Sequence, residues 1–245
     1  MRDSEQPLGA VMRAALLAGL AAGLAAAVFH FVLTEPIIER AITLETLRHQ
    51  AEGTLEEPMV SRGAQQVGLF VGFLLFGLTW SLLLGAAYHI TQRWLPAWSM
   101  LKRGLLLAAL GYWTMALFPA LKYPANPPGV GDPDTIGYRQ ALYLALLALS
   151  VVGTVLAGVA AYRHPRGWRL GLAVLAVFDA VVFVAMPANP DVVSMPADIV
   201  TPFRVLSVLG LTVFWAVMGL AFGLLLASRD AARARFRPQV VRRAG

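Results

Sequence analysis

The chain lacks cysteine and is poor in charged residues and histidine. Of its 245 residues, 14% are charged, 58% are hydrophobic and four are histidines. Without cysteine, neither a disulfide framework nor a thiolate metal site can form, so metal ligands are limited to nitrogen, oxygen and thioether groups. Because soluble domains carry roughly 25% charged residues, the low charge and the mean hydropathy of +0.66 indicate an integral membrane protein.

Motifs of several enzyme classes are also missing. The sequence has no phosphate-cradling glycine loop with Lys and Ser or Thr, no zinc-protease His-Glu pair and no Gly-x-Ser-x-Gly elbow. We therefore expect no enzymatic activity and no bound cofactor. Because this chain has no ATP-binding motif, an ATPase would have to be a separate subunit.

Six apolar stretches reach or approach the roughly 20 residues that an α-helix needs to cross a bilayer. They predict an all-α, polytopic transmembrane domain over residues 1–228, followed by a basic tail over residues 229–245. The spans cover residues 11–33, 67–90, 104–121, 140–162, 170–186 and 205–227. The first apolar run is longer than that of a signal peptide, so we expect it to be a retained helix.

The charge distribution predicts the orientation in the membrane. Fourteen of the twenty Lys and Arg residues lie at the two ends of the chain and in the loops after the second and fourth spans. By the positive-inside rule, both termini are cytoplasmic, as expected in a bacterial inner membrane. Ten of the fourteen acids lie in the three opposite loops, so the outer face has a net charge of −4 and would concentrate cations. The arginines of the tail are expected to bind membrane lipid headgroups and not nucleic acid.

The tetrapeptide Pro-Ala-Asn-Pro occurs twice, at Pro124 to Pro127 and at Pro187 to Pro190, each time after an apolar run. Proline lacks the amide donor and restricts the residue before it, so each copy should end a helix and form a stiff corner. Asp, Arg and a further apolar run follow each copy. This pattern predicts helical hairpins related by an internal parallel repeat.

A third, more diverged hairpin is a further prediction, in which Glu35-Pro36 ends the outgoing first helix and Arg62 precedes the returning one. The polar stretch between them, residues 37–66, is assigned as an outer acidic loop. Its isoleucines leave open an amphipathic helix on the outer membrane surface over part of this stretch.

Glycine pairs at four-residue spacing predict close packing between helices, because small residues let helix backbones approach. The pairs are Gly19 and Gly23, Gly68 and Gly72, Gly167 and Gly171, and Gly219 and Gly223.

Three polar residues within or next to the spans are candidate metal ligands. Asp179 lies inside the fifth span, where a carboxylate costs a few kcal/mol and often marks a transport path or a proton site. A protonated Asp179 bonded to a neighbour is the structural alternative. His30 and Glu35 together suit a divalent transition metal such as Co²⁺, provided that Pro36 bends the chain enough to bring them together.

The corners supply three further candidates, the oxygen ligands of Asn126, Asp132 and Asn189. Asn and Asp also cap turns, so a structural role is the alternative. Arg62, Arg139 and Arg204 stand at the entrances of three returning spans. Because three arginines would repel a cation, we expect them to pair with outer carboxylates and hold the corners. Binding of an anionic group stays open.

Five segments carry a resemblance to a known family. They read LTEPIIERA at 33–41, SRG at 61–63, LKYPANPPGVGDP at 121–133, and PANP at 187–190 with MPAD at 195–198. The sequence resembles the CbtA family over about residues 12–227. These bacterial membrane proteins are predicted to be the larger subunit of a cobalt transporter.

The resemblance implies a role in cobalt uptake for cobalamin synthesis and a partner, CbtB, a short protein with one span and a histidine-bearing tail. It provides no metal ligands, so the six candidates stand on their chemistry alone. We expect the membrane subunit of a divalent-metal uptake transporter. Two alternatives stay open: a non-transporting accessory subunit of a larger membrane complex, and a carrier of an anionic or corrinoid solute.

Overall fold

The computed structural model describes residues 5–53, 60–95, 97–191 and 193–236. Within these ranges the chain consists of helices and connecting turns, and no strand is present. Six helical segments are long and apolar enough to cross a membrane, which confirms the all-α, six-span prediction. The last nine residues of the predicted tail, 237–245, lie outside the described ranges.

Five of the six predicted spans lie entirely within a helical segment, and the span 170–186 ends one residue after the helix Gly167–Ala185. The first combines α1 (Leu8–Phe29), the π-helix η1 (His30–Thr34) and α2 (Glu35–Glu52). The third combines α4 (Met100–Tyr112), the π-helix η2 (Trp113–Leu117) and α5 (Phe118–Lys122). The other elements are α3 (Arg62–Thr91), the 3-10 turn η3 (Pro133–Thr135), α6 (Ile136–Arg163), α7 (Gly167–Ala185) and α8 (Ala197–Phe236).

Pro36 does not end the first helix, so this part of the hairpin prediction is wrong. A proline inside a helix removes one hydrogen bond and crowds the carbonyl four residues back. The π-turn of η1 ends two residues before Pro36 and adjusts the backbone at this point. The helix α2 therefore continues to Glu52, where Gly53 caps it with φ +68°. Most of the predicted outer loop 37–66 is therefore helical. Pro119 follows η2 in the same way.

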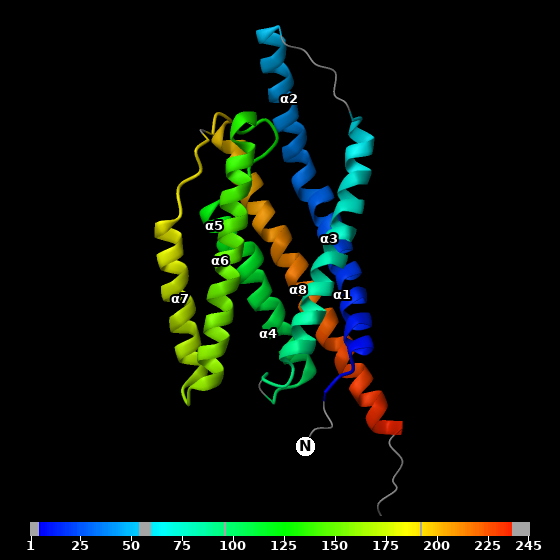
Figure 1. Ribbon diagram of the computed structural model, residues 1–245. Helices are drawn as coiled ribbons and strands as arrows, with labels where there is room; N and C mark the ends of the chain where they lie inside the picture. The colour runs from blue at the N-terminus through cyan, green and yellow to red at the C-terminus, as the bar shows by residue number, and fades with distance from the viewer. Residues whose placement is uncertain (1–4, 54–59, 96, 192, 237–245) are drawn as a thin grey trace, which may run out of the picture.

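Helix α8 is the central element of the bundle (Figure 1). It packs against both α1 and α4, and α3 packs against α1. At the left edge of the figure, α6 and α7 pack against each other, and η2 and α5 contact α6. The second tetrapeptide thus joins two helices, α7 and α8, whose main contacts are with other helices.

The two ends of the bundle differ in content. The beginning of α1 and the end of α8 lie at one end, whereas α2 and the loops around both tetrapeptides lie at the other (Figure 1). We call the latter the corner end. The beginning of α1 and the end of α8 thus lie on one side, and the assignment of this side to the cytoplasm stays a prediction.

Three of the four glycine pairs lie at helix contacts. A Cβ on Gly19 would clash with the carbonyl oxygen of Gly77, and a Cβ on Gly77 with that of Gly19, so α1 and α3 meet backbone to backbone. Gly171 lies against the backbone of α6, and Gly223 against that of α4. The prediction is wrong for the pair at 68 and 72, where an added Cβ would meet nothing within 4 Å.

This difference within α3 predicts opposite outcomes for two matched substitutions. Gly77→Ala should destabilise the bundle by about 1–3 kcal/mol, because the added methyl must push α1 and α3 apart. Gly72→Ala should leave stability unchanged or raise it, because its Cβ has room and alanine favours a helix. Thermal unfolding of the purified protein in detergent, followed by tryptophan fluorescence, measures both. Equal melting temperatures would contradict the close contact.

Candidate functional site

At the corner end, the two tetrapeptide loops are cross-linked by arginines. Arg139, which follows the first copy, pairs through Nε with Oδ2 of Asp191 beside the second copy, at 2.9 Å. Arg204, which follows the second copy, donates from Nη2 to Oδ1 of Asn126 in the first copy, at 2.7 Å. Each arginine therefore binds the loop of the other copy. We call these four residues the corner cluster.

Further hydrogen bonds strengthen the corner cluster. Asp191 is buried, and its Oδ1 accepts from the Thr135 hydroxyl at 2.6 Å. The Tyr123 hydroxyl donates to the carbonyl of Pro187 at 2.7 Å, so the beginnings of both loops are also joined. Gly131, with φ +105°, passes so close to the ion pair that a Cβ would collide with both partners. These contacts make the two corners one rigid unit.

Asp132 and Asn189 cap turns in the loops. Oδ1 of Asp132 accepts from the backbone amide of Asp134 at 2.9 Å, and Oδ1 of Asn189 accepts from the amide of Asp191 at 3.0 Å. With Asn126 bonded to Arg204, all three corner candidates therefore use a side-chain oxygen to hold the loops. A metal ion would have to bind a remaining lone pair of these side-chain oxygens, or displace the hydrogen bonds that they accept.

Arg62 and Arg139 pair with carboxylates, whereas Arg204 has no carboxylate partner among the described residues. Arg62 contacts Glu35 and also bonds Glu39, with an Nη2 to Oε1 distance of 2.8 Å. Arg204 bonds the Asn126 amide, and its buried Nε has no hydrogen-bond partner among the described residues. The predicted pairing with outer carboxylates thus holds for two of the three arginines.

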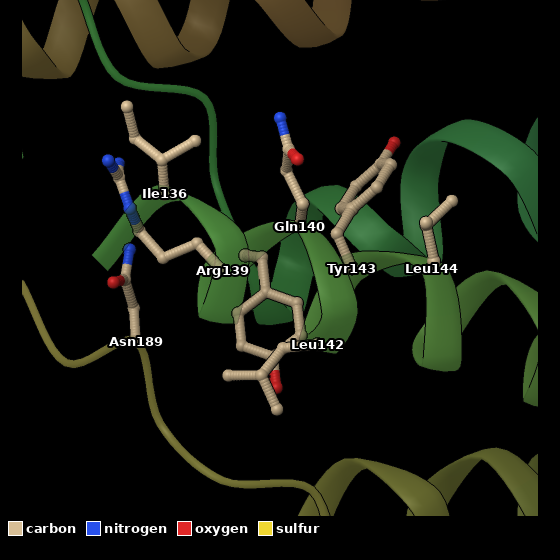
Figure 2. Close-up of a pocket in the computed structure, with 8 residues that line it drawn as sticks. Ile136, Arg139, Gln140, Leu142, Tyr143, Leu144 and Asn189 are labelled. Carbon is tan, nitrogen blue, oxygen red and sulfur yellow. The ribbon is translucent and has the colours of Figure 1, made fainter. Parts of the chain in front are cut away.

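An open pocket of about 480 Å³ lies beside the corner cluster (Figure 2). Figure 2 shows Arg139 and Asn189 at one side of it and Gln140 and Tyr143 at the other. The other lining residues are Tyr123, Ile136, Leu142 and Leu144. The charged group in this lining is Arg139, which is paired with Asp191, so the pocket presents no set of cation ligands.

His30 lies buried among α1, α3 and α8. Its Nδ1 is 2.9 Å from the Thr34 hydroxyl, and its ring stacks on Phe73 with centroids 4.8 Å apart. Its Nε2 faces Gly210 of α8, where an added Cβ would clash with it. Glu35, in contrast, accepts hydrogen bonds from α3. His30 and Glu35 therefore contact different parts of the bundle, and their side chains do not form a shared metal site.

Asp179 is buried between α6, α7 and η2, with 3% of its surface exposed. Its Oδ2 accepts from the indole Nε1 of Trp113 at 2.7 Å. Its Oδ1 has no hydrogen-bond partner among the described residues, and a Cβ on Gly153 of α6 would lie 3.1 Å from it. Asp179 is thus the candidate ligand that keeps a buried oxygen free of any bond.

The six candidate ligands do not converge. Within the described residues, no group of three or more His, Asp and Glu side chains is placed to hold a metal ion. Sequence reasoning also missed Trp113, the donor to Asp179, and the buried Ser150 on the neighbouring helix. The sequence signal that could have identified both residues is a polar side chain in the middle of an apolar run.

Comparison with known proteins identifies a family. The model of the family described as "Probable cobalt transporter subunit (CbtA)" matches residues 9–227, nearly the whole chain. No curated protein and no solved structure matches the chain.

The ion pairs of the corner end predict unequal effects for two arginine substitutions. Arg139→Gln should cost about 3 kcal/mol, because it leaves the buried Asp191 carboxylate without its charged partner. Arg40→Gln should cost at most about 1 kcal/mol, because Arg40 pairs with Asp198 at 2.8 Å on the exposed surface. Thermal unfolding in lipid nanodiscs measures both. Equal costs would show that the corner cluster does not hold the loops.

Proposed function

The chain belongs to the CbtA family of probable cobalt transporter subunits, and on this premise we propose that it is the membrane subunit of a divalent-metal uptake system that prefers cobalt. The family supports the role of a transporter subunit. We further propose that the system lies in a bacterial inner membrane, with both termini of this chain in the cytoplasm, and that it supplies cobalt for cobalamin synthesis.

The observation that supports a path through this chain is the state of Asp179. A carboxylate inside a membrane span is costly and usually marks a path for ions or protons. Oδ1 of Asp179 is buried and has no partner among the described residues, so it is available to a cation. The metal would be concentrated at the acidic corner end, meet oxygen atoms of the corners, and pass inward by way of Asp179. His30 and Glu35 would join this path only by giving up their present contacts.

A second subunit would complete the metal site. One carboxylate oxygen is too few to hold a divalent ion, and the described part of this chain gathers no cluster of three ligand side chains. Imidazole and carboxylate together suit Co²⁺. A short, CbtB-like partner with a single span and histidine ligands would supply the groups that are lacking here.

A non-transporting accessory subunit is the second candidate, because the six proposed ligands lie at separate places in the bundle. A carrier of an anionic or corrinoid solute has less support. Arg62 and Arg139 are paired with carboxylates. Arg204 pairs with no carboxylate of the described residues, and its Nε has no hydrogen-bond partner among them.

Cobalt accumulation in cells tests the proposal. Deletion of both subunits should lower cobalt uptake, and their return should restore it. Return with Asp179→Asn should leave uptake near the deletion level, because the amide cannot hold the cation charge. The matched control is Asp198→Asn, an exposed carboxylate at the corner end, which should restore uptake. Full uptake with Asp179→Asn would remove this residue from the path, and uptake unchanged by the double deletion would overturn the function itself.

A further inference from the structure

An open pocket lies between α1 and α8 at the end of the bundle opposite the corner end, where α1 begins and α8 ends (Figure 1). Its volume is about 300 Å³. The pocket is lined by four residues of α1 and two of α8, which are Arg13, Ala14, Leu16, Leu17, Leu225 and Arg229. We call it the basic pocket, because one arginine from each helix faces it.

The two arginines of the basic pocket are not neutralised by carboxylates. Among the described residues, no Asp or Glu forms an ion pair with Arg13 or Arg229. The neighbouring Asp230 accepts a hydrogen bond from the Gln6 side chain at 3.1 Å. Two like charges that face one pocket repel each other, so an anion between them would be bound favourably. The pocket therefore differs from the corner end, where carboxylates pair with arginines.

Beyond the arginines, the basic pocket continues into an apolar track along α1. Leu17, Leu20 and Leu24 follow Arg13 at helical spacing, so the four residues share one face of the helix. The exposed fractions of these leucines are 56%, 40% and 52%. Lipid acyl chains are as apolar as leucine and cover such a face in a membrane. The pocket thus joins two unpaired positive charges to a surface that suits an acyl chain.

The arginines of the basic pocket lie at the level expected for lipid headgroups. Arg13 stands near the beginning of the predicted span 11–33, and Arg229 comes just after the span 205–227. Long basic side chains near the ends of spans extend to the membrane interface. The beginning of α1 adds the partial positive charge of a helix N-terminus, and its first turn contains no acidic residue. This end is the proposed cytoplasmic side, where anionic lipids give the leaflet a negative potential.

We propose that the basic pocket binds one anionic phospholipid. Arg13 and Arg229 hold the headgroup phosphate between them, since guanidinium groups pair with phosphate through parallel hydrogen bonds. One acyl chain lies on the leucine track of α1. This site goes beyond a general attraction of the basic tail for headgroups, because it places one lipid between two named helices and selects its charge. A zwitterionic lipid should bind less well, because its ammonium group is repelled by the two arginines. The site does not depend on the transported solute.

Native mass spectrometry of the purified full chain in detergent tests the site. Separate titrations with phosphatidylglycerol, which is anionic, and phosphatidylethanolamine, which is zwitterionic, give the affinity for the first bound lipid. The native protein should bind phosphatidylglycerol more tightly. Arg13→Gln and Arg229→Gln should each weaken phosphatidylglycerol binding about fivefold, the loss expected for one basic group near a membrane surface. The double variant should bind both lipids equally.

Two control variants separate the site from a general effect of charge. Arg169→Gln removes an exposed arginine at the start of α7, at the same end of the bundle, and should leave the affinity unchanged. Arg13→Lys keeps the positive charge and should retain the preference for phosphatidylglycerol. Equal affinity of the native protein for the two lipids, or an equal loss in Arg169→Gln, would overturn the site.

A third titration distinguishes a lipid from a soluble anion. Glycerophosphoglycerol, which is the headgroup without acyl chains, should bind far more weakly than phosphatidylglycerol, because it gains nothing from the leucine track. Equal binding of the two compounds would show a site for a soluble phosphate and would overturn the lipid assignment.

Discussion

The structure depends on the requirement that backbone polar groups inside a bilayer find their hydrogen-bond partners within the protein. Pro36 and Pro119 each remove one donor from a membrane-length helix, and a π-turn precedes both of them. The two π-turns begin at His30 and at Trp113, which are buried or partly buried polar rings at helix contacts. The backbone irregularity that accommodates each proline therefore coincides with a polar side chain inside the bundle, and one of these, Trp113, bonds the carboxyl group on which the proposed function rests.

At the corner end, the ion pairs leave the long-range attraction of cations unchanged but reduce the number of carboxylates that can bind a metal directly. Ion pairs do not change the net charge of the outer loops, so the long-range attraction for cations persists. The ion pairs do, however, occupy carboxylates that could otherwise bind a metal: Arg62 pairs with Glu35 and Glu39, and Arg139 pairs with Asp191. The corner end therefore attracts cations as a whole, while several of its individual carboxylates serve to hold the loops together. Asp179 differs because its hydrogen-bond donor is the neutral Trp113 indole, and no arginine or lysine of the described residues pairs with it.

The two halves of the bundle differ in how closely their helices pack. The contact of α1 with α3 is backbone to backbone, through Gly19 and Gly77, and α8 packs along both α1 and α4. The pair of α6 and α7 joins the rest through η2, α5, the corner cluster and the ring contact of Tyr162 with Trp94. Asp179 and Ser150 lie within this peripheral pair. A cation that binds Asp179 would therefore act on the contact between two helices that the remaining bundle constrains less.

Composition and apolar run length were sufficient to predict the six spans and the all-helical class, because the bilayer imposes a helix of about 20 residues on any apolar segment that crosses it. The resemblance carried by the corner motifs was likewise visible in the chain alone. The continuation of helix past Pro36 was not, because a local rule for proline does not include the π-turn that accommodates it. Only the tertiary structure decided which side chains meet: Arg139 with Asp191, Arg204 with Asn126, and Trp113 with Asp179. These partners are 52, 78 and 66 residues apart, and helix packing, which no local pattern specifies, brings them together.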